Sequence, residues 1–196
     1  MLFRSPSSGI KSLDDLLRKA KAAPDKLTFA SGGHGTSPHM AGELLKASAG
    51  VKLVHIPYKG SQPAIVDAIA GQVDIVFDGV ASAIGYIKSG QLMPLAVSAN
   101  ERLPALPEVP TIAEVIPGFE VAGWSGIAAP AGMPAAVVQR LNQEVNRALK
   151  SSAVSERFAQ LNVLALSGSP ADMQAHVKSE LEKWKKVIAD NGIKAD

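Results

Sequence analysis

Short apolar segments alternate with helix-like segments through the first half of this chain, and glycine or proline marks most of the joints between them. The apolar segments are short enough for buried strands. The helix-like segments space their apolar residues as a helix does, for example Leu13, Leu16 and Leu17 after the capping residue Ser12. This alternation predicts a parallel or mixed α/β sheet. The predicted strands are residues 27–30, 51–56, 73–77 and 92–98.

The second half has a different pattern. Four prolines between residues 103 and 117 interrupt any long element, which indicates a connection between lobes. Residues 121–129 are predicted to be extended, and helices are predicted at 134–150, 153–160 and 170–189.

Two smaller signals concern the sheet. Pro94 lies inside the last predicted strand, and proline favours an edge position. The residues before Ser8 match no recognisable element, and they carry no cationic leader followed by an apolar core. We therefore expect no signal peptide in this sequence and a truncated beginning.

Composition limits the function classes. Hydrophobic residues make up 46% and charged residues 19%, an ordinary globular balance. The formal net charge of +2 comes without a basic stripe, so nucleic acid is not an expected partner. The chain has no cysteine, which excludes disulfides and thiol catalysis. No apolar run approaches the roughly 18 residues that a membrane-spanning helix needs.

The glycine-rich segment 31–39 follows a predicted strand and opens a predicted helix. Ser37 suits the N-cap and Pro38 the first turn. Glycines allow several backbone N–H groups to point one way, and a helix start favours an anion. The segment has neither the ending of a P-loop nor the glycine spacing of a dinucleotide fold. It is a candidate anion-binding loop, although a chain reversal alone would also use glycine and serine.

Three loops follow the carboxyl ends of predicted strands, where ligands bind in open α/β sheets. They are residues 31–37, 57–61 and 78–79, and we expect them to converge on one crevice. Lys59 would place a positive charge beside the glycine loop, unless it is a solvated surface lysine. Asp78 could accept from a ligand hydroxyl or amine, but ordering its own loop is the favoured role.

The histidines do not indicate a metal site by spacing. His34 and His39 are five residues apart across a loop-to-helix boundary, which is not the i, i+4 spacing of two ligands on one helix. His34 is a candidate ligand contact, whereas His39 and His55 are expected to make local hydrogen bonds and His176 to lie at the surface. Residues 123–126 lack the spacing of a nucleophile elbow, so we expect no catalytic residue and no cofactor.

Six ordered motifs resemble the substrate-binding receptors of tripartite tricarboxylate transporters, the Bug family. They are SGGHGTSPH at 31–39, HIPYKG at 55–60, GQVDIVFD at 71–78, LPEVPT at 106–111, APAGMP at 129–134 and WKKVI at 184–188. The resemblance runs from about Ser8 to the last residue. It implies a two-lobed periplasmic binding protein of type II, which binds a small carboxylate and presents it to a membrane transporter without any reaction.

The resemblance also implies which residues form the site. Ser31, Gly33, Gly35, Thr36 and Ser37 fall in the glycine loop of the second lobe, whose backbone amides and hydroxyls hold a ligand carboxylate. His34 stands where the family pattern has asparagine, and the position of Asp78 borders the cleft. Lys59, which its position beside the glycine loop proposes independently of the resemblance, completes the predicted ligand-binding set.

Lobe boundaries follow from the same resemblance. Residues 8–118 would be the second lobe, and 119–196 the crossover with the carboxy-terminal part of the first lobe. Family members have a signal peptide and further residues before this segment, including the first-lobe glycine loop. We therefore expect weaker ligand binding than in a complete receptor, and apolar surface on 134–189 that is exposed or covered by another copy.

Two other functions are kept open. The effector-sensing domains of LysR-type regulators share the two-lobed architecture, and fold does not fix function. An enzyme could use the glycine loop as an oxyanion site, with His34 as the available base.

Overall fold

A computed structural model describes residues 1–191 and 193 of the chain. It divides into two compact units. Unit 1 is Met1–Gly123 together with Ile193, and unit 2 is formed by residues 124–191. Each unit is described below by itself.

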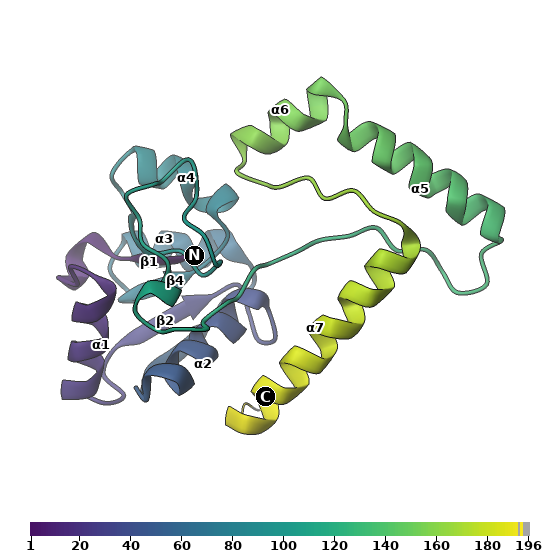
Figure 1. The fold of residues 1–196 in the computed structure, drawn as a ribbon. Helices are drawn as coiled ribbons and strands as arrows, with labels where there is room; N and C mark the ends of the chain where they lie inside the picture. The colour runs from purple at the N-terminus through teal and green to yellow at the C-terminus, as the bar shows by residue number, and fades with distance from the viewer. Residues whose placement is uncertain (192, 194–196) are drawn as a thin grey trace. The chain divides into compact units, whose positions relative to one another are not determined.

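Unit 1 is built on a five-stranded mixed sheet (Figure 1). Its spatial order is β3-β2-β4-β1-β5. Strand β2 is parallel to β3 and β4, whereas β1 is antiparallel to β4 and β5. The predicted mixed α/β class is confirmed, and β5 lies at an edge as Pro94 indicated. The strands are β1 (Leu2–Arg4), β2 (Thr28–Ser31), β3 (Val54–Pro57), β4 (Ile75–Phe77) and β5 (Met93–Ala96).

The prediction that the residues before Ser8 form no regular element was wrong. Leu2 and Phe3 are fully buried in β1, which lies between β4 and β5 in the interior of the sheet. Leu2 is paired with Phe77 on one side and with Ala96 on the other. Sequence pattern missed this strand because three residues are too few to show the alternation that identifies strands.

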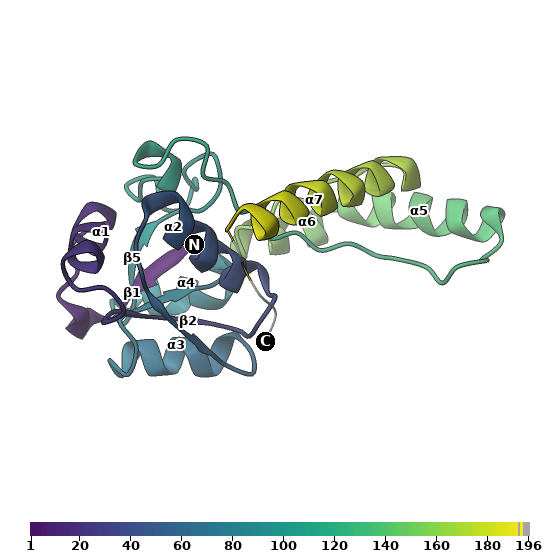
Figure 2. The same cartoon turned by 90° about the horizontal axis from the view of Figure 1, so that it is seen from below.

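Helices cover both faces of this sheet. Figure 2 shows α2 and α3 on opposite sides of it. Alternate residues of a strand point to opposite faces, so Phe29 packs against Gly42 of α2 while its neighbour Ala30 packs in the cluster that holds Ala64 and Ile65 of α3. The helices are α1 (Leu13–Ala22), α2 (Ser37–Ala49), α3 (Ser61–Ile69) and α4 (Val80–Lys88), with 3-10 turns η1 (Pro6–Ser8) and η2 (Ile112–Glu114).

The proline-rich connection returns to the sheet edge. The backbone N–H of Val121 donates to the Ser98 carbonyl at 2.8 Å, and the Ser98 hydroxyl donates to the Val121 carbonyl at 2.8 Å. No strand is assigned between residues 120 and 130, where an extended segment was predicted. The end of this connection therefore lies beside the carboxyl end of β5.

Unit 2 consists of α5 (Ala135–Leu149), α6 (Ser152–Gln160) and α7 (Pro170–Asn191), close to the three predicted helices. The side-chain amides of Asn142 and Asn146 each donate to the Gly168 carbonyl at 2.9 Å, which ties the segment before α7 to α5. Both indole N–H groups, of Trp124 and Trp184, donate to one carboxylate oxygen of Glu180. Within the described ranges, no helix has the length and apolar character that crossing a membrane requires.

Candidate functional site

The glycine loop joins the end of β2 to the start of α2. The Thr36 hydroxyl accepts from the His39 N–H at 3.4 Å and donates to the Gly33 carbonyl at 2.7 Å. Thr36 is therefore the N-cap, and the assignment of Ser37 to that position was wrong by one residue. Ser37 is instead the first helical residue, and its side chain is exposed.

Two glycines of the loop have backbone conformations that other residues rarely adopt. Gly33 has φ of 130° and Gly35 has φ of 71°, both in a region that side chains disfavour. At Gly33 an added Cβ would also lie 3.1 Å from the Tyr58 carbonyl oxygen. The glycines thus fix the course of the loop and its close approach to the next one.

The three loops predicted to converge are joined by hydrogen bonds. The N–H groups of Tyr58 and Gly60 donate to the carbonyls of Ser31 and Gly32 at 3.0 and 3.1 Å. The hydroxyl of Ser61 then donates to Asp78 Oδ1 at 2.9 Å. The parallel strands β2, β3 and β4 end at one edge of the sheet, which brings the loops after them together.

Asp78 orders the loop after β4. Its Oδ1 atom accepts from the Ser61 and Ser82 hydroxyls at 2.9 and 3.0 Å and from the Gly79 N–H at 2.6 Å. Its Oδ2 atom is buried and has no hydrogen-bond partner among the described residues. The carboxylate is thus a structural acceptor through one oxygen and an uncommitted acceptor through the other.

A hollow of about 90 Å³ lies beside these loops. The first residues of two helices, Ser37 of α2 and the Gly79 cap of α4, both line it. Two helix starts bring positive dipole ends to the same space, which favours an anion, although the Asp78 carboxylate opposes this field. Other lining residues include Ala41, Phe77, Ser98 and Val121.

The remaining predicted contacts lie around the glycine loop. Ser31 is fully buried, while His34 and Lys59 are exposed. A larger and more open depression between α1, the end of α2 and residues 115–117 contains none of the predicted site residues.

Three histidines that were predicted to have separate roles lie together in the structure. The His39 and His55 rings stack with centroids 4.2 Å apart, and His34 meets them edge-on at 5.3 and 5.1 Å. His39 makes the expected local hydrogen bond, since the Gly35 N–H donates to its Nδ1 at 3.1 Å. His55 makes a contact between strands instead, with Nε2 2.7 Å from the Ser31 hydroxyl. Spacing along the chain could not reveal this cluster, because His55 enters it through the β2–β3 pairing.

His176, by contrast, lies in unit 2. It is exposed on α7 as predicted, and its ring meets the Trp124 ring edge-on at 4.8 Å.

Residues 1–193 match the family described as the tripartite tricarboxylate transporter family receptor. The chain belongs to this family. The resemblance found in the motifs is confirmed, and the match begins before Ser8, at the residues that form β1.

Two curated relatives of this receptor chain are longer than it is. A UPF0065 protein from the tcbD-tcbE intergenic region of Pseudomonas sp. strain P51 is 44% identical over 96% of this chain and 57% of its own length. Protein BugT of Bordetella pertussis is 33% identical over 99% of this chain and 60% of its own length. The chain thus spans less than two thirds of these relatives.

Solved structures share the fold of this receptor chain. The R. palustris Rpa4515 structure with adipate has a TM-score of 0.93 at 34% identity, covering 98% of this chain and 65% of that one. The periplasmic binding protein BugD has a TM-score of 0.91 at 32% identity, covering 100% and 66%. The fold is therefore that of part of a periplasmic binding protein.

Proposed function

We propose that this chain is part of a receptor that binds a small carboxylate and delivers it to a membrane transporter of the tripartite tricarboxylate type. Residues 8–118 would form the second lobe and residues 119–196 the crossover with part of the first lobe. The observation that carries the proposal is that the start of α2, where the glycine loop ends at Ser37, and the start of α4 line one hollow. Family membership supports it, as do structural neighbours with bound adipate and malate.

In this proposal the backbone supplies most of the carboxylate binding. Gly33, Gly35 and Thr36 hold the loop, and Ser37 offers its N–H and hydroxyl at the start of α2. A helix start of this kind stabilises an anion through unpaired N–H groups and the dipole. His34 and Lys59 are exposed nearby and would contact the part of the ligand beyond its carboxylate.

Asp78 would have a different part in binding. An ionised carboxylate accepts hydrogen bonds and donates none, so the Oδ2 atom would favour a ligand hydroxyl or ammonium group over a second carboxylate. Ser31 is buried beneath the loop and would support its shape.

A matched pair of glycines tests the proposal. Gly35 and Gly50 have φ of 71° and 61°, and an added Cβ would meet nothing within 4 Å at either position. Both Gly35→Ala and Gly50→Ala therefore carry a similar backbone strain, but only the first changes the loop. Adipate, malate and citrate are titrated by calorimetry in EDTA. We expect Gly35→Ala to weaken binding of the preferred carboxylate by roughly tenfold or more, as loss of a hydrogen bond to a charged group does.

Two results would contradict the proposal. One is the absence of heat with every carboxylate, both for this chain and for a version extended to the length of its relatives. The other is an equal loss of affinity in Gly35→Ala and Gly50→Ala.

The proposed function contains no catalytic step. The close pair of Ser31 and His55 resembles a nucleophile with its base, but the Ser31 side chain is fully buried and its hydroxyl also donates to the Gly33 carbonyl. A substrate would not reach that oxygen. We therefore infer binding without reaction, and hydrolysis of a model ester that Ser31→Ala abolishes would contradict this.

Unit 2 is proposed to be covered in the working protein. Its exposed apolar side chains would contact the rest of a receptor or a second copy of this chain. Light scattering after size exclusion tests self-association: a dimer that Leu166→Asp dissociates supports it, and a monomer at high concentration opposes it. The exposed apolar side chains are those of Ile127, Leu141, Leu164, Leu166 and Leu181.

Export to the periplasm belongs to the same proposal, and cell fractionation of the full-length gene product tests it.

A further inference from the structure

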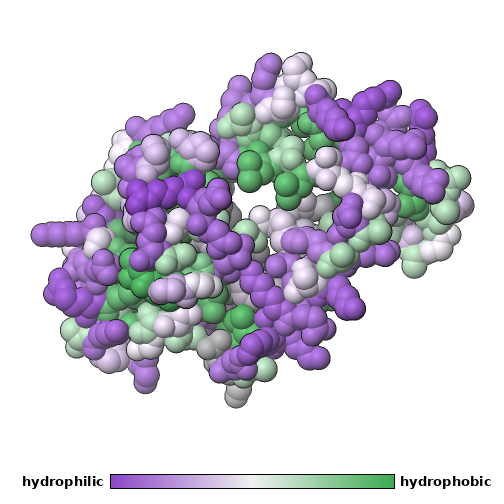
Figure 3. All heavy atoms as spheres, in the orientation of Figure 1, coloured by the Kyte–Doolittle hydropathy of each residue, from purple (hydrophilic) through white to green (hydrophobic). Residues whose placement is uncertain are grey.

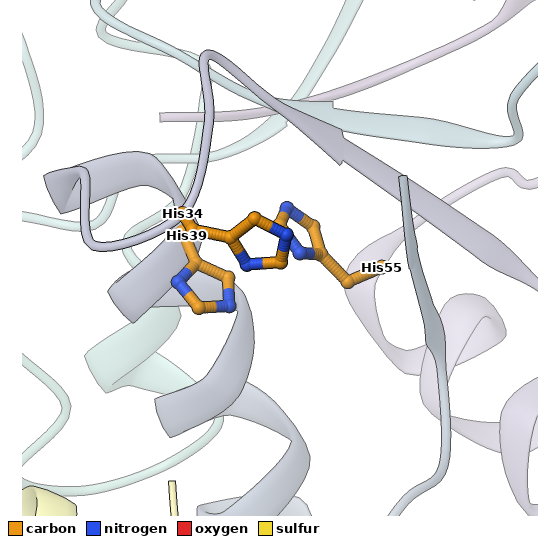
Figure 4. Close-up of side chains that lie close together, drawn as sticks. All are labelled: His34, His39 and His55. Atoms are coloured by element: carbon orange, nitrogen blue, oxygen red, sulfur yellow. The ribbon is translucent and has the colours of Figure 1, made fainter. Parts of the chain in front are cut away.

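The cluster of His34, His39 and His55 brings three imidazoles from three different segments to one place (Figure 4). His34 lies in the glycine loop, His39 in the first turn of α2, and His55 on β3. One ring nitrogen from each residue can be chosen so that the three atoms lie within 4.8 Å of one another. Neutral imidazole is the commonest metal ligand in proteins, and a three-histidine set occurs in zinc sites that keep an open fourth position.

Hydrogen bonds orient two of these rings. With the Ser31 hydroxyl donating to the Gly33 carbonyl at 3.3 Å, His55 Nε2–H would donate to that hydroxyl at 2.7 Å, and this tautomer of His55 would carry its lone pair on Nδ1. The Gly35 N–H donates to His39 Nδ1, so the neutral ring carries its proton on Nε2, 3.8 Å from Glu43 Oε1. A hydroxyl or carboxylate on the far nitrogen is the usual outer partner of a metal-binding histidine.

We propose that His34, His39 and His55 bind one divalent transition-metal ion of the zinc, nickel and copper class. Tetrahedral coordination at Zn–N distances of about 2.0–2.1 Å needs nitrogens roughly 3.3 Å apart. The rings must therefore approach one another by a modest rotation. His34 is exposed and sits between glycines at positions 33 and 35, so it can make most of that adjustment.

The site would be linked to the glycine loop. Metal coordination through His39 Nδ1 would break the hydrogen bond that this atom accepts from the Gly35 N–H. The Gly35 N–H would then be able to donate to a ligand of the glycine loop. A three-histidine set also leaves a coordination position for water or for a carboxylate oxygen. Bound metal would thus change how the loop meets an anion, which goes beyond the proposed carboxylate function.

The chain supplies its own control for a test. It has four histidines, and His176 lies on α7 in unit 2. Zn²⁺ is titrated by calorimetry into the chain without carboxylate, and Co²⁺ is followed by its visible absorption. We expect one ion per chain, an affinity at least about tenfold weaker in His34→Asn, and no change in His176→Asn. His34 is exposed, so its replacement should leave the fold intact, which circular dichroism checks.

A second variant tests the outer partner. Glu43 lies 3.8 Å from His39 and is held by Lys46 at 2.8 Å. Glu43→Gln should weaken Zn²⁺ binding by about tenfold without removing a ligand. The proposal is overturned if the chain binds no stoichiometric Zn²⁺, if His34→Asn binds as tightly as the wild type, or if His176→Asn loses as much affinity. Carboxylate titration in EDTA is independent of all three results, so the two proposals can fail separately.

Discussion

Units 1 and 2 are both predicted well as secondary structure, yet among the described residues only those of unit 1 form a buried core. Every buried hydrophobic residue in that part of the chain lies between Leu2 and Val121. None of residues 124–190 is buried, and Leu164 and Leu166 are 87% and 82% exposed. Figure 3 shows hydrophobic side chains at the surface around α6 and the segment after it. Amphipathic spacing therefore predicts that a helix forms, but not that this chain supplies what covers it.

The largest expected effect is a difference in stability between the units. Both tryptophans, Trp124 and Trp184, lie in unit 2, and both tyrosines, Tyr58 and Tyr86, lie in unit 1. We expect urea to change tryptophan fluorescence well before it changes the tyrosine signal, because unit 2 has little buried apolar surface to lose. Coincident transitions, in a protein shown to be monomeric, would mean that the two units unfold as one.

A matched leucine pair gives the next largest effect. Leu45 of α2 is fully buried, whereas Leu141 of α5 is 48% exposed. Leu45→Ala should lower the free energy of unfolding by about 2–5 kcal/mol, since it leaves a cavity in a packed core. Leu141→Ala should change it by no more than about 0.5 kcal/mol. Equal costs in denaturant titrations would show that unit 2 is packed against a partner.

A matched glycine pair compares how rigid the two units are. An added Cβ would lie 2.2 Å from the Phe29 ring at Gly42, and 2.4 Å from the terminal methyl of Met173 at Gly126. The ring is fixed in the core, while the methionine end can turn away. Gly42→Ala should therefore cost about 1–3 kcal/mol and Gly126→Ala close to nothing. Thermal denaturation measures both, and a costly Gly126→Ala would contradict the flexible packing of unit 2.

The smallest effect concerns polar contacts. Burial, and then the hydrogen bond to Asp67 at 2.7 Å, raise the pKa of Tyr58 to about 12. The folded chain thus holds this proton more tightly, and that contribution to stability is present below pH 10 and lost as pH rises toward 12. Tyr58→Phe should cost about 1 kcal/mol at pH 7 and remove this alkaline loss.

An exposed pair in unit 2 is the control for Tyr58. The ion pair of Lys186 and Asp190 on α7 is exposed, so Asp190→Asn should leave the unfolding midpoint unchanged. Absorbance of tyrosinate against pH follows Tyr58 directly. The wild type has two tyrosines and Tyr58→Phe has one, so the absorbance change is compared per tyrosine. Identical curves per tyrosine above pH 10 would refute the raised pKa of Tyr58.

Much of the fold could be predicted because its signals are local. Helix caps, glycine stops and apolar spacing placed the helices 134–150, 153–160 and 170–189 and four of the five strands close to their observed bounds. Strand β1 escaped because its position depends on pairing with β4 and β5, which no pattern within Leu2–Arg4 encodes. The N-cap was predicted one residue too late, at Ser37 instead of Thr36, because both side chains can cap a helix and only the backbone conformation decides between them.

The candidate site likewise has features that could be predicted from the sequence and features that could not. The convergence of the three loops followed from the rule for strand ends in α/β sheets. The histidine cluster did not, since His55 comes from a neighbouring strand and only the β2–β3 register brings it beside His39. That the glycine loop binds the ligand is a prediction from the family resemblance, which could not give a role to His34 because this position departs from the family pattern.

The interior place of β1 has a consequence for how the chain acquires its fold. Leu2 must pair with Phe77 and Ala96, partners more than seventy residues away along the chain. Contacts of such long range slow folding, because the loop between the partners must close before any pairing is gained. During synthesis Leu2 and Phe3 would stay apolar and unpaired until β4 and β5 had left the ribosome. A chaperone that holds extended apolar segments would therefore have a long opportunity to bind β1.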